Sequence, residues 1–115
     1  MVPEITIAIQ GDSLDFYPLR VGRTNILNTG YIVGQHSSDS DIQEEEIRVD
    51  GAIKIWGYAW ADTTDDWETN NYLAACQTSM SNPPGLQYFW AESLHYFYTY
   101  LYGQGQGLSS NDYQE

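Results

Sequence analysis

Carboxylates are the most numerous ionisable side chains in this 115-residue sequence, since it contains sixteen Asp and Glu. The polar run over residues 35–46 carries Asp39, Asp41 and Glu44, and oxygen ligands of this kind bind calcium. An EF-hand loop, however, requires glycine for its sharp turn at the position of Glu44. We therefore expect a solvated acidic surface loop here, with a loose calcium site as the alternative.

The two histidines and the single cysteine are isolated in the sequence. His36, His95 and Cys76 lack the close spacing that zinc ligands show. Cys76 lies in the apolar stretch LAAC, where a lone cysteine is most often a small buried hydrophobic residue. His95 falls in a predicted helix, and we expect it on the surface among tyrosines. No cofactor and no metal ion is therefore predicted.

Gly11-Asp12-Ser13-Leu14 follows an apolar strand near the N-terminus, and in that position it resembles the first block of the GDSL-type esterases and lipases. The resemblance implies that Ser13 would be the nucleophile and that its backbone N–H would help to hold the oxyanion. Later blocks depart from the family pattern. Residues 57–60 lack the expected Asn-Asp pair, and only Glu92-x-x-His95 stands where the family has Asp-x-x-His. A turn rich in turn-forming residues is the preferred interpretation, and a small serine esterase is the alternative.

Three aromatic side chains alternate near the middle of the chain, where Trp56, Tyr58 and Trp60 would share one face of a predicted strand. Exposed rings in such a row can stack against sugars, as they do in carbohydrate-binding modules. The same face could instead lie beneath a helix and form the core. We expect the core, with a carbohydrate-binding module as the alternative.

The densest group of aromatic residues lies over residues 86–102, LQYFWAESLHYFYTYLY. Its apolar residues form one stripe at helical spacing, while Tyr88, Tyr96 and Tyr100 fall on the opposite face. We therefore predict a helix that buries one aromatic face and shows tyrosines on the other. For residues 95–102 a strand is the competing prediction, because tyrosines there occupy alternate positions and aromatic residues favour strands.

The elements that would position these residues are predicted from periodicity and turn residues. Three strands are expected early in the chain, at residues 4–10, 14–21 and 31–34. Asp50-Gly51 is expected to turn a hairpin within residues 46–60, and residues 66–80 are predicted to form a helix. The sequence thus predicts an α+β domain over residues 1–102, with an antiparallel sheet from the N-terminal half packed against a C-terminal helical hairpin. Residues 103–115 would be an extended tail.

The charge of the chain limits its expected partners. Four basic residues stand against sixteen acidic ones, for a formal net charge of −12. Phosphate backbones and anionic membrane surfaces need clustered basic residues, so neither nucleic acid nor membrane is expected as a partner. No segment is apolar for the length of a membrane-spanning helix, and the N-terminus lacks the basic region of a signal peptide. We expect synthesis and folding in the cytoplasm.

Together these features favour a non-catalytic structural or adaptor subunit of a large protein assembly, such as a head, neck or tail component of a virion. Tyr, Asn, Ser, Gln and Gly are abundant and Lys is nearly absent, a composition more typical of protein contacts than of solvated surfaces. The expected partners are other protein subunits, in a homo- or hetero-oligomer. The side chains predicted to make the contacts are Trp56, Tyr58, Trp60, Tyr88, Tyr96 and Tyr100.

Overall fold

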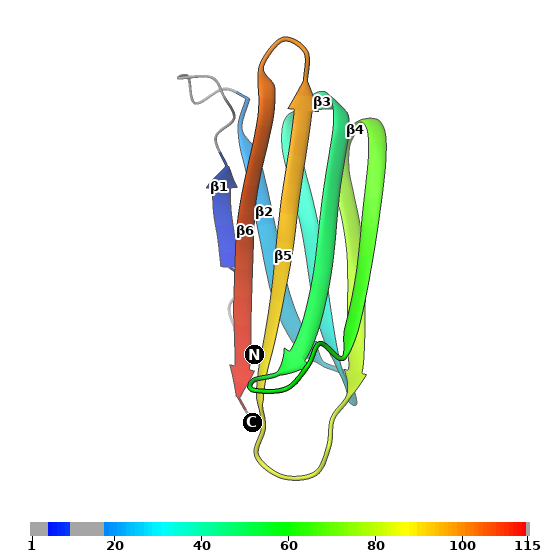
Figure 1. Ribbon diagram of the computed structural model, residues 1–115, viewed down its shortest axis with the longest axis vertical. Coiled ribbons are helices and arrows are strands. Elements are labelled where there is room, and N and C mark those ends of the chain that lie inside the picture. Colours follow the sequence, from blue (N-terminus) through cyan, green and yellow to red (C-terminus); the bar gives the residue numbers. More distant parts are fainter. Residues whose placement is uncertain (1–4, 10–17, 115) are drawn as a thin grey trace.

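The computed structural model describes residues 5–9 and 18–114, and this part of the chain contains strands and no helix (Figure 1). It therefore offers no helix with the length and hydrophobicity that a membrane crossing needs. The strands are β1 (Ile5–Ile9), β2 (Arg20–Asn28), β3 (Tyr31–Ile55), β4 (Asp62–Ser81), β5 (Tyr88–Thr99) and β6 (Gly103–Gln114). The predicted α+β class is wrong, because the fold is all-β.

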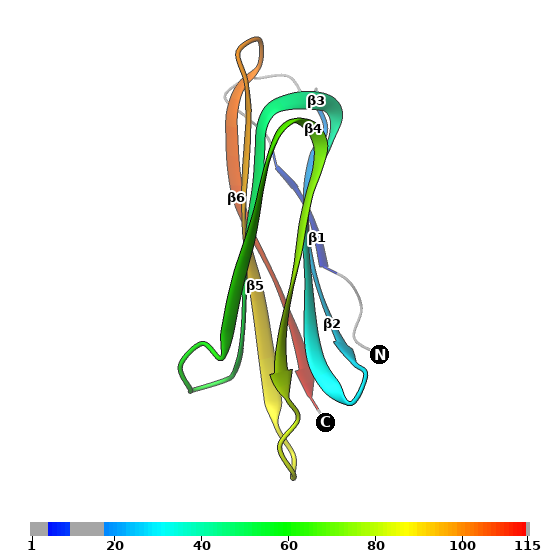
Figure 2. The same cartoon turned by 90° about the vertical axis from the view of Figure 1, so that its right-hand side faces the viewer.

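The strands form one antiparallel sheet that curls like half of a barrel (Figure 2). Five strands follow one path in the order β1-β2-β3-β5-β6, and β4 lies off this path, paired with β3. The molecule is elongated along the strands, with extents of 50 × 22 × 22 Å.

β3 produces the curl because it belongs to both halves of the sheet. Residues 32–40 of β3 pair with β2, and residues 46–55 pair with β5. β4 follows β3 through both parts, with a register irregularity between Asp39 and Glu44 where the long hairpin bends. The bend turns the two halves toward each other, so that β2 and β5 face one another across the interior (Figure 2).

β5 shows why a strand forms where a helix was predicted. Its buried side chains occupy every second position from residue 89 to 99, and the side chains between them point outward. Rings lie on both faces, with two phenylalanines inside and Trp90 and Tyr96 outside, so the hydrophobicity pattern hides the alternation. The helix predicted for this segment is wrong. The strand alternative for residues 95–102 is right as far as Thr99, after which the chain turns.

The helix predicted for residues 66–80 is also wrong, because this segment is an arm of the bent β3–β4 hairpin. Exposed and less exposed residues alternate along the first half of β4, which is the period of a strand. Asn70 lies at the bend with a φ of 51°, a left-handed conformation that asparagine tolerates better than most residues.

The free edge of β4 is covered by side chains of the same strand. They come from the first half of β4 and reach backbone groups of the second half across the open side of the sheet. The contacts are Asp62 accepting from the N–H of Ser79 (2.9 Å), Thr64 donating to the carbonyl of Gln77 (2.9 Å) and Asp66 accepting from the N–H of Ala75 (3.0 Å). Because an uncovered edge strand can pair with another chain, this ladder opposes edge-to-edge association through β4.

The turn predicted at Asp50-Gly51 and the acidic loop predicted over residues 35–46 are wrong, because β3 runs through both. Glycine is required at position 51 for packing, since a Cβ there would lie 2.4 Å from Cδ2 of His36. A Cβ on Gly22 would lie 2.3 Å from Cδ2 of His95. The two glycines therefore make room for imidazole rings inside the curled sheet.

The remaining segments agree more closely with their predictions. The strand predicted at residues 4–10 is confirmed by β1, and the short strand at residues 31–34 is the start of β3. The first half of the strand predicted at residues 14–21 lies outside the described residues, and its last two residues begin β2. The segment predicted to be a tail after the domain forms strand β6 over Gly103–Gln114 and pairs with β5 in the same sheet.

The interior is apolar toward its ends and polar in between. One apolar cluster contains Ile47, Val49, Ala74 and Phe97. The other contains Ile26, Ile32, Ile53, Phe89 and Ala91. Along the inner face of β5, Ser93 and His95 lie between the two clusters, so the middle of the molecule must satisfy its polar groups internally.

Candidate functional site

A continuous chain of hydrogen-bonded side chains occupies the middle of the interior, and we call it the imidazole–hydroxyl chain. Its members come from five strands and all are buried. They follow in the order Thr78, His36, Ser93, Thr24, Ser109, His95 and Ser38, with successive contacts of 2.8, 2.6, 2.6, 2.6, 2.6 and 2.7 Å. The chain ends where Ser38 donates to the backbone carbonyl of Arg48 at 2.8 Å.

This carbonyl fixes the direction of the hydrogen bonds. The hydroxyl of Ser38 has one hydrogen, which it gives to Arg48, so it must accept from Nδ1–H of His95. The Nε2 atom of His95 then accepts from Ser109, and Ser109 accepts from Thr24. For neutral rings, the same order carried to the far end of the chain places the hydrogen on Nδ1 of both imidazoles, with Ser93 donating to Thr24 at 2.6 Å in preference to the carbonyl of Arg23 at 3.5 Å.

The surroundings favour these neutral imidazoles. Burial lowers the pKa of His36 from 6.5 to about 4, although Asp62 acts in the opposite direction. Burial and the neighbouring imidazole lower the pKa of His95 to about 4. A protonated ring would donate from both nitrogens, whereas each Nε2 here accepts from a hydroxyl. Protonation would therefore force hydroxyls in the chain to turn their hydrogens elsewhere.

Serine beside histidine is the pairing of a nucleophile and its base. Ser93 lies 2.6 Å from His36, and Ser109 lies 2.6 Å from His95. Both serines are at most 1% exposed and both histidines are 2% exposed, so these side chains are almost fully shielded from solvent. The imidazole–hydroxyl chain is thus an internal framework that joins five strands. The prediction that His95 lies on a helix surface is wrong.

Cys76 is half-buried and packs beside the apolar cluster of Ile47 and Phe97. Burial raises the pKa of its thiol, and the carboxylates of Asp66 and Asp65 act in the same direction. The thiolate, which is the reactive form, is therefore disfavoured at neutral pH.

A second buried polar group lies beside the bend of the hairpin. Arg20 donates from Nε to Oε2 of Glu44 at 2.8 Å and from Nη2 to Oε1 at 2.9 Å, and both side chains are fully buried. Ser40 also donates to Oε2 of Glu44 at 2.7 Å, and Arg20 reaches the carbonyl of Gly103 at 3.0 Å. Both oxygens of Glu44 are thus occupied within the fold.

The other members of the alternative calcium set have separate partners. Asp39 forms an ion pair with Arg23, and Asp41 accepts the backbone N–H of Leu19 at 2.9 Å. Within residues 5–9 and 18–114, no group of three His, Cys, Asp or Glu side chains is arranged to hold a metal ion.

All four tryptophans of the sequence gather on one outer face of the sheet, which we call the tryptophan face. It is formed by residues 46–54 of β3, the first half of β4, β5, β6 and the loop over residues 56–61. The opposite outer face, over β2, the first part of β3 and the second half of β4, is mainly polar. A hollow there is lined by Arg23, Asn25, Gln35, His36, Ser37, Ala75, Cys76 and Gln77.

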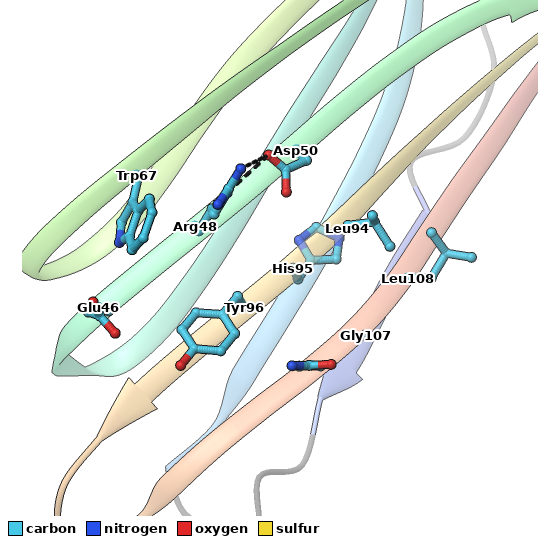
Figure 3. A pocket seen from close by; sticks show the side chains of 10 residues that line it. Glu46, Arg48, Asp50, Trp67, Leu94, His95, Tyr96, Gly107 and Leu108 are labelled. Atoms are coloured by element: carbon cyan, nitrogen blue, oxygen red, sulfur yellow. Dashed lines mark hydrogen bonds and ion pairs between the residues drawn. The ribbon is translucent and has the colours of Figure 1, made fainter. Parts of the chain in front are cut away.

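Strand register arranges the tryptophan face in rows that cross β4, β3, β5 and β6. One row is Trp67, Arg48, Tyr96 and Gln106, and the next is Asp65, Asp50, Leu94 and Leu108. A groove of about 670 Å³ lies over these two rows (Figure 3). It is lined by both rows apart from Asp65, together with Glu46, His95 and Gly107.

Arg48 organises the β4 side of this groove. It donates to Oδ1 of Asp50 from Nε at 3.0 Å and from Nη2 at 2.9 Å (Figure 3). Its Nη2 also lies 3.8 Å from Oδ2 of Asp65. Its guanidinium carbon lies 5.0 Å from the ring centroid of Trp67. The cation is therefore balanced within the groove, and the indole is held beside it.

The other end of the tryptophan face holds Lys54, the only lysine of the sequence, near two indoles. Its Nζ lies 4.4 Å from the ring centroid of Trp60 and 5.1 Å from that of Trp56. Trp56 also packs edge-on against Trp90, with centroids 5.3 Å apart. Trp56 and Trp60 nevertheless remain 57% and 40% exposed, so this end presents large apolar rings to solvent.

The structure separates the residues predicted to make contacts. Trp56, Trp60 and Tyr88 lie at the Lys54 end of the tryptophan face, and Tyr96 lies in the groove. Tyr58 is exposed in the loop over residues 56–61, and Tyr100 is exposed in the turn after β5. The strand face of Trp56 was expected to be covered as core, and this expectation is wrong.

Sequence reasoning missed Trp67, Leu94 and Leu108, which line the groove. Trp67 fell in a predicted helix, and the two leucines were assigned to an apolar stripe and to a tail. Asp65, Trp67 and Thr69 lie on one side of β4, at the two-residue spacing of a strand. This spacing is the signal that could have placed Trp67 on a strand face.

Ser13 and the rest of the turn predicted at Gly11–Leu14 lie outside the described residues. Comparison with protein-family models, with curated proteins and with solved structures gives no match to this chain. The function is therefore inferred from the imidazole–hydroxyl chain and the tryptophan face. In the described residues these define an all-β protein with a closed polar interior and an open aromatic surface.

Proposed function

We propose that this chain is a non-catalytic structural or adaptor subunit that docks onto other protein subunits through the tryptophan face. The observation that carries the proposal is the gathering of all four indoles on that face. Tryptophan and tyrosine are enriched at protein contacts, because they bury a large area for a small loss of side-chain entropy. Trp56, Trp60 and Trp67 are each at least 40% exposed, which leaves apolar surface for a partner to cover.

The charge distribution supports a partner that carries basic side chains. All four basic residues of the chain have partners within it. These are Arg20 with Glu44, Arg23 with Asp39, Arg48 with Asp50, and Lys54 with the indoles of Trp56 and Trp60. The net charge of −12 must then be complemented from outside, and complementary charge guides protein association.

The assembly that we propose is a multi-subunit particle, with a virion head, neck or tail as the example. The abundance of contact-forming residue types in the sequence supports this class. The side chains over the second half of β4 agree with this class, because they oppose open-ended strand pairing at that edge.

The proposal is tested by measuring the mass of the purified full chain, alone and mixed with the proteins encoded beside it. We expect a complex of defined stoichiometry, heavier than the 13.1 kDa chain. The double variant Trp56→Ala/Trp60→Ala should weaken the complex at least about tenfold, since buried tryptophans are frequent hot spots. Tyr31→Ala is the matched control, because Tyr31 is 64% exposed on the opposite outer face. A lone monomer with no stoichiometric partner would contradict the proposal.

A further inference from the structure

We propose that the groove over Trp67, Arg48 and Tyr96 is a binding site for a neutral oligosaccharide. This function goes beyond docking to protein subunits, and it uses a different part of the tryptophan face. The groove lies over the middle of the four strands, whereas Trp56 and Trp60 lie toward the Lys54 end.

The groove has the dimensions of a short sugar chain. Neighbouring strands lie about 4.8 Å apart, so its floor spans about 14 Å from β4 to β6. Its volume of about 670 Å³ falls within the usual range for small-molecule sites. A second hollow of about 350 Å³ shares Arg48, Asp50 and Leu94 with it and extends toward Trp60. A chain of several sugar units could therefore continue from one hollow into the next.

The floor offers the two kinds of contact that a sugar ring needs. A pyranose has apolar C–H faces and a rim of hydroxyls that both donate and accept hydrogen bonds. Trp67, Leu94 and Leu108 are each about half exposed and supply apolar surface. The amide of Gln106 and the phenol of Tyr96 both donate and accept, and the second carboxylate oxygen of Asp50 points away from Arg48 (Figure 3).

The charges around the groove disfavour an anionic ligand. The guanidinium of Arg48 is matched by Asp50 and approached by Asp65, so it does not present an unbalanced cation to a phosphate or sulfate. Glu46 adds negative charge at one end of the groove, and the whole chain carries −12. Polyanions are therefore repelled.

Titration of the full chain with defined sugars tests the site, with calorimetry and tryptophan fluorescence as readouts. The neutral probes are oligosaccharides of about three to six units of glucose, mannose, galactose or N-acetylglucosamine, a range that covers the groove alone and the groove together with the second hollow. The anionic probes are heparin fragments and polygalacturonate. We expect micromolar to millimolar binding of at least one neutral series and none of the anionic probes.

Variants of exposed residues make the result specific to the groove. Trp67→Ala should weaken sugar binding about tenfold or more, because it removes the largest apolar surface, and Trp67→Phe should recover part of it. Trp56→Ala should leave sugar binding unchanged, whereas it belongs to the surface tested for subunit docking. An unchanged urea midpoint shows that each variant is folded.

Three outcomes would overturn the assignment. They are no neutral sugar bound at millimolar concentration, binding of the anionic probes alone, or sugar binding that Trp67→Ala does not weaken. Loss of subunit association in Trp67→Ala without any sugar binding would show that the groove holds a protein segment instead. Because the docking test relies on Trp56 and Trp60, the two proposals can fail independently.

Discussion

The middle of the interior of the curled sheet and the tryptophan face hold the reverse of the side chains expected of a small domain. Inside, two imidazoles, five hydroxyls and a guanidinium–carboxylate pair are closed off from solvent. Outside, Trp56, Trp60 and Trp67 are each at least 40% exposed. The members of the interior chain are linked to one another, whereas the outer rings leave much of their surface uncovered.

This difference separates the residues that specify the fold from those available for contacts. A directed hydrogen-bond chain is satisfied in one arrangement of the strands, so it favours a single register. The exposed indoles bury little area within the chain and contribute correspondingly little to folding. Residue types usually associated with catalysis thus join the two apolar clusters in holding the structure, while several large aromatic side chains lie on the surface.

A fall in pH should have the largest effect on the free energy of unfolding, and this effect arises in the interior. Below pH 6.5 the unfolded chain binds protons on its histidines, whereas the folded chain resists protonation until about pH 4. The stability that comes from the neutral imidazoles is therefore complete above pH 6.5 and is lost as the pH falls toward 4. The loss in free energy of unfolding is on the order of 3 kcal/mol for each histidine. Urea unfolding at a series of pH values measures it.

Ring-proton NMR provides the control for this effect. Neither His36 nor His95 should titrate between about pH 7 and pH 5 in the folded chain, while both should titrate near 6.5 in the urea-unfolded chain. A folded-state pKa near 6.5 for either ring would show that the interior is open to solvent.

Removal of one partner of the buried ion pair should have the next largest effect. Glu44→Ala leaves the guanidinium of Arg20 buried without its carboxylate, and the free energy of unfolding should fall by about 3–5 kcal/mol. Asp39→Ala removes the partner of Arg23 from a partly exposed pair, and should cost less than about 1 kcal/mol. Equal losses in urea unfolding would mean that the two pairs do not differ in burial.

The packing of the interior rings is tested by a single methyl group. Gly51→Ala would place Cβ 2.4 Å from Cδ2 of His36, so the ring must move and the hydrogen-bond chain must stretch. We expect a loss of about 1–3 kcal/mol in the free energy of unfolding. Ala52→Ser, on the outward side of the next position in β3, should change it by less than about 0.5 kcal/mol.

The smallest effect on stability is expected for the substitution of Trp67, although tryptophan has the largest side chain. Trp67→Ala should change the free energy of unfolding by less than about 0.5 kcal/mol, because the indole is 54% exposed and packs mainly beside Arg48. Phe97→Ala inside the sheet should cost about 3–5 kcal/mol by comparison. Thermal or urea unfolding that ranks Trp67→Ala with Phe97→Ala would place the indole in the core and remove it as a contact residue.

Local patterns predicted some elements and misled for others. The alternating isoleucines of residues 4–10 were enough to predict β1, because one face of that segment is apolar and the other is not. β5 was mistaken for a helix because both of its faces carry rings, which removes the contrast that periodicity detects. Asp50-Gly51 is a residue pair common in turns, but here it lies in the middle of strand β3. The glycine is needed there because the ring of His36 packs against it.

By itself the sequence determined the residue types, the charge of −12 and the stock of aromatic side chains. Only the tertiary structure decided that His36 meets Ser93, 57 positions away, and that Thr24 meets Ser109, 85 positions away. It also decided that Trp67, Arg48, Tyr96 and Gln106 form one row across four strands. The physical reason is that these contacts depend on strand order, register and the bend in β3, which arise from packing between segments distant in the chain and leave no local pattern to read.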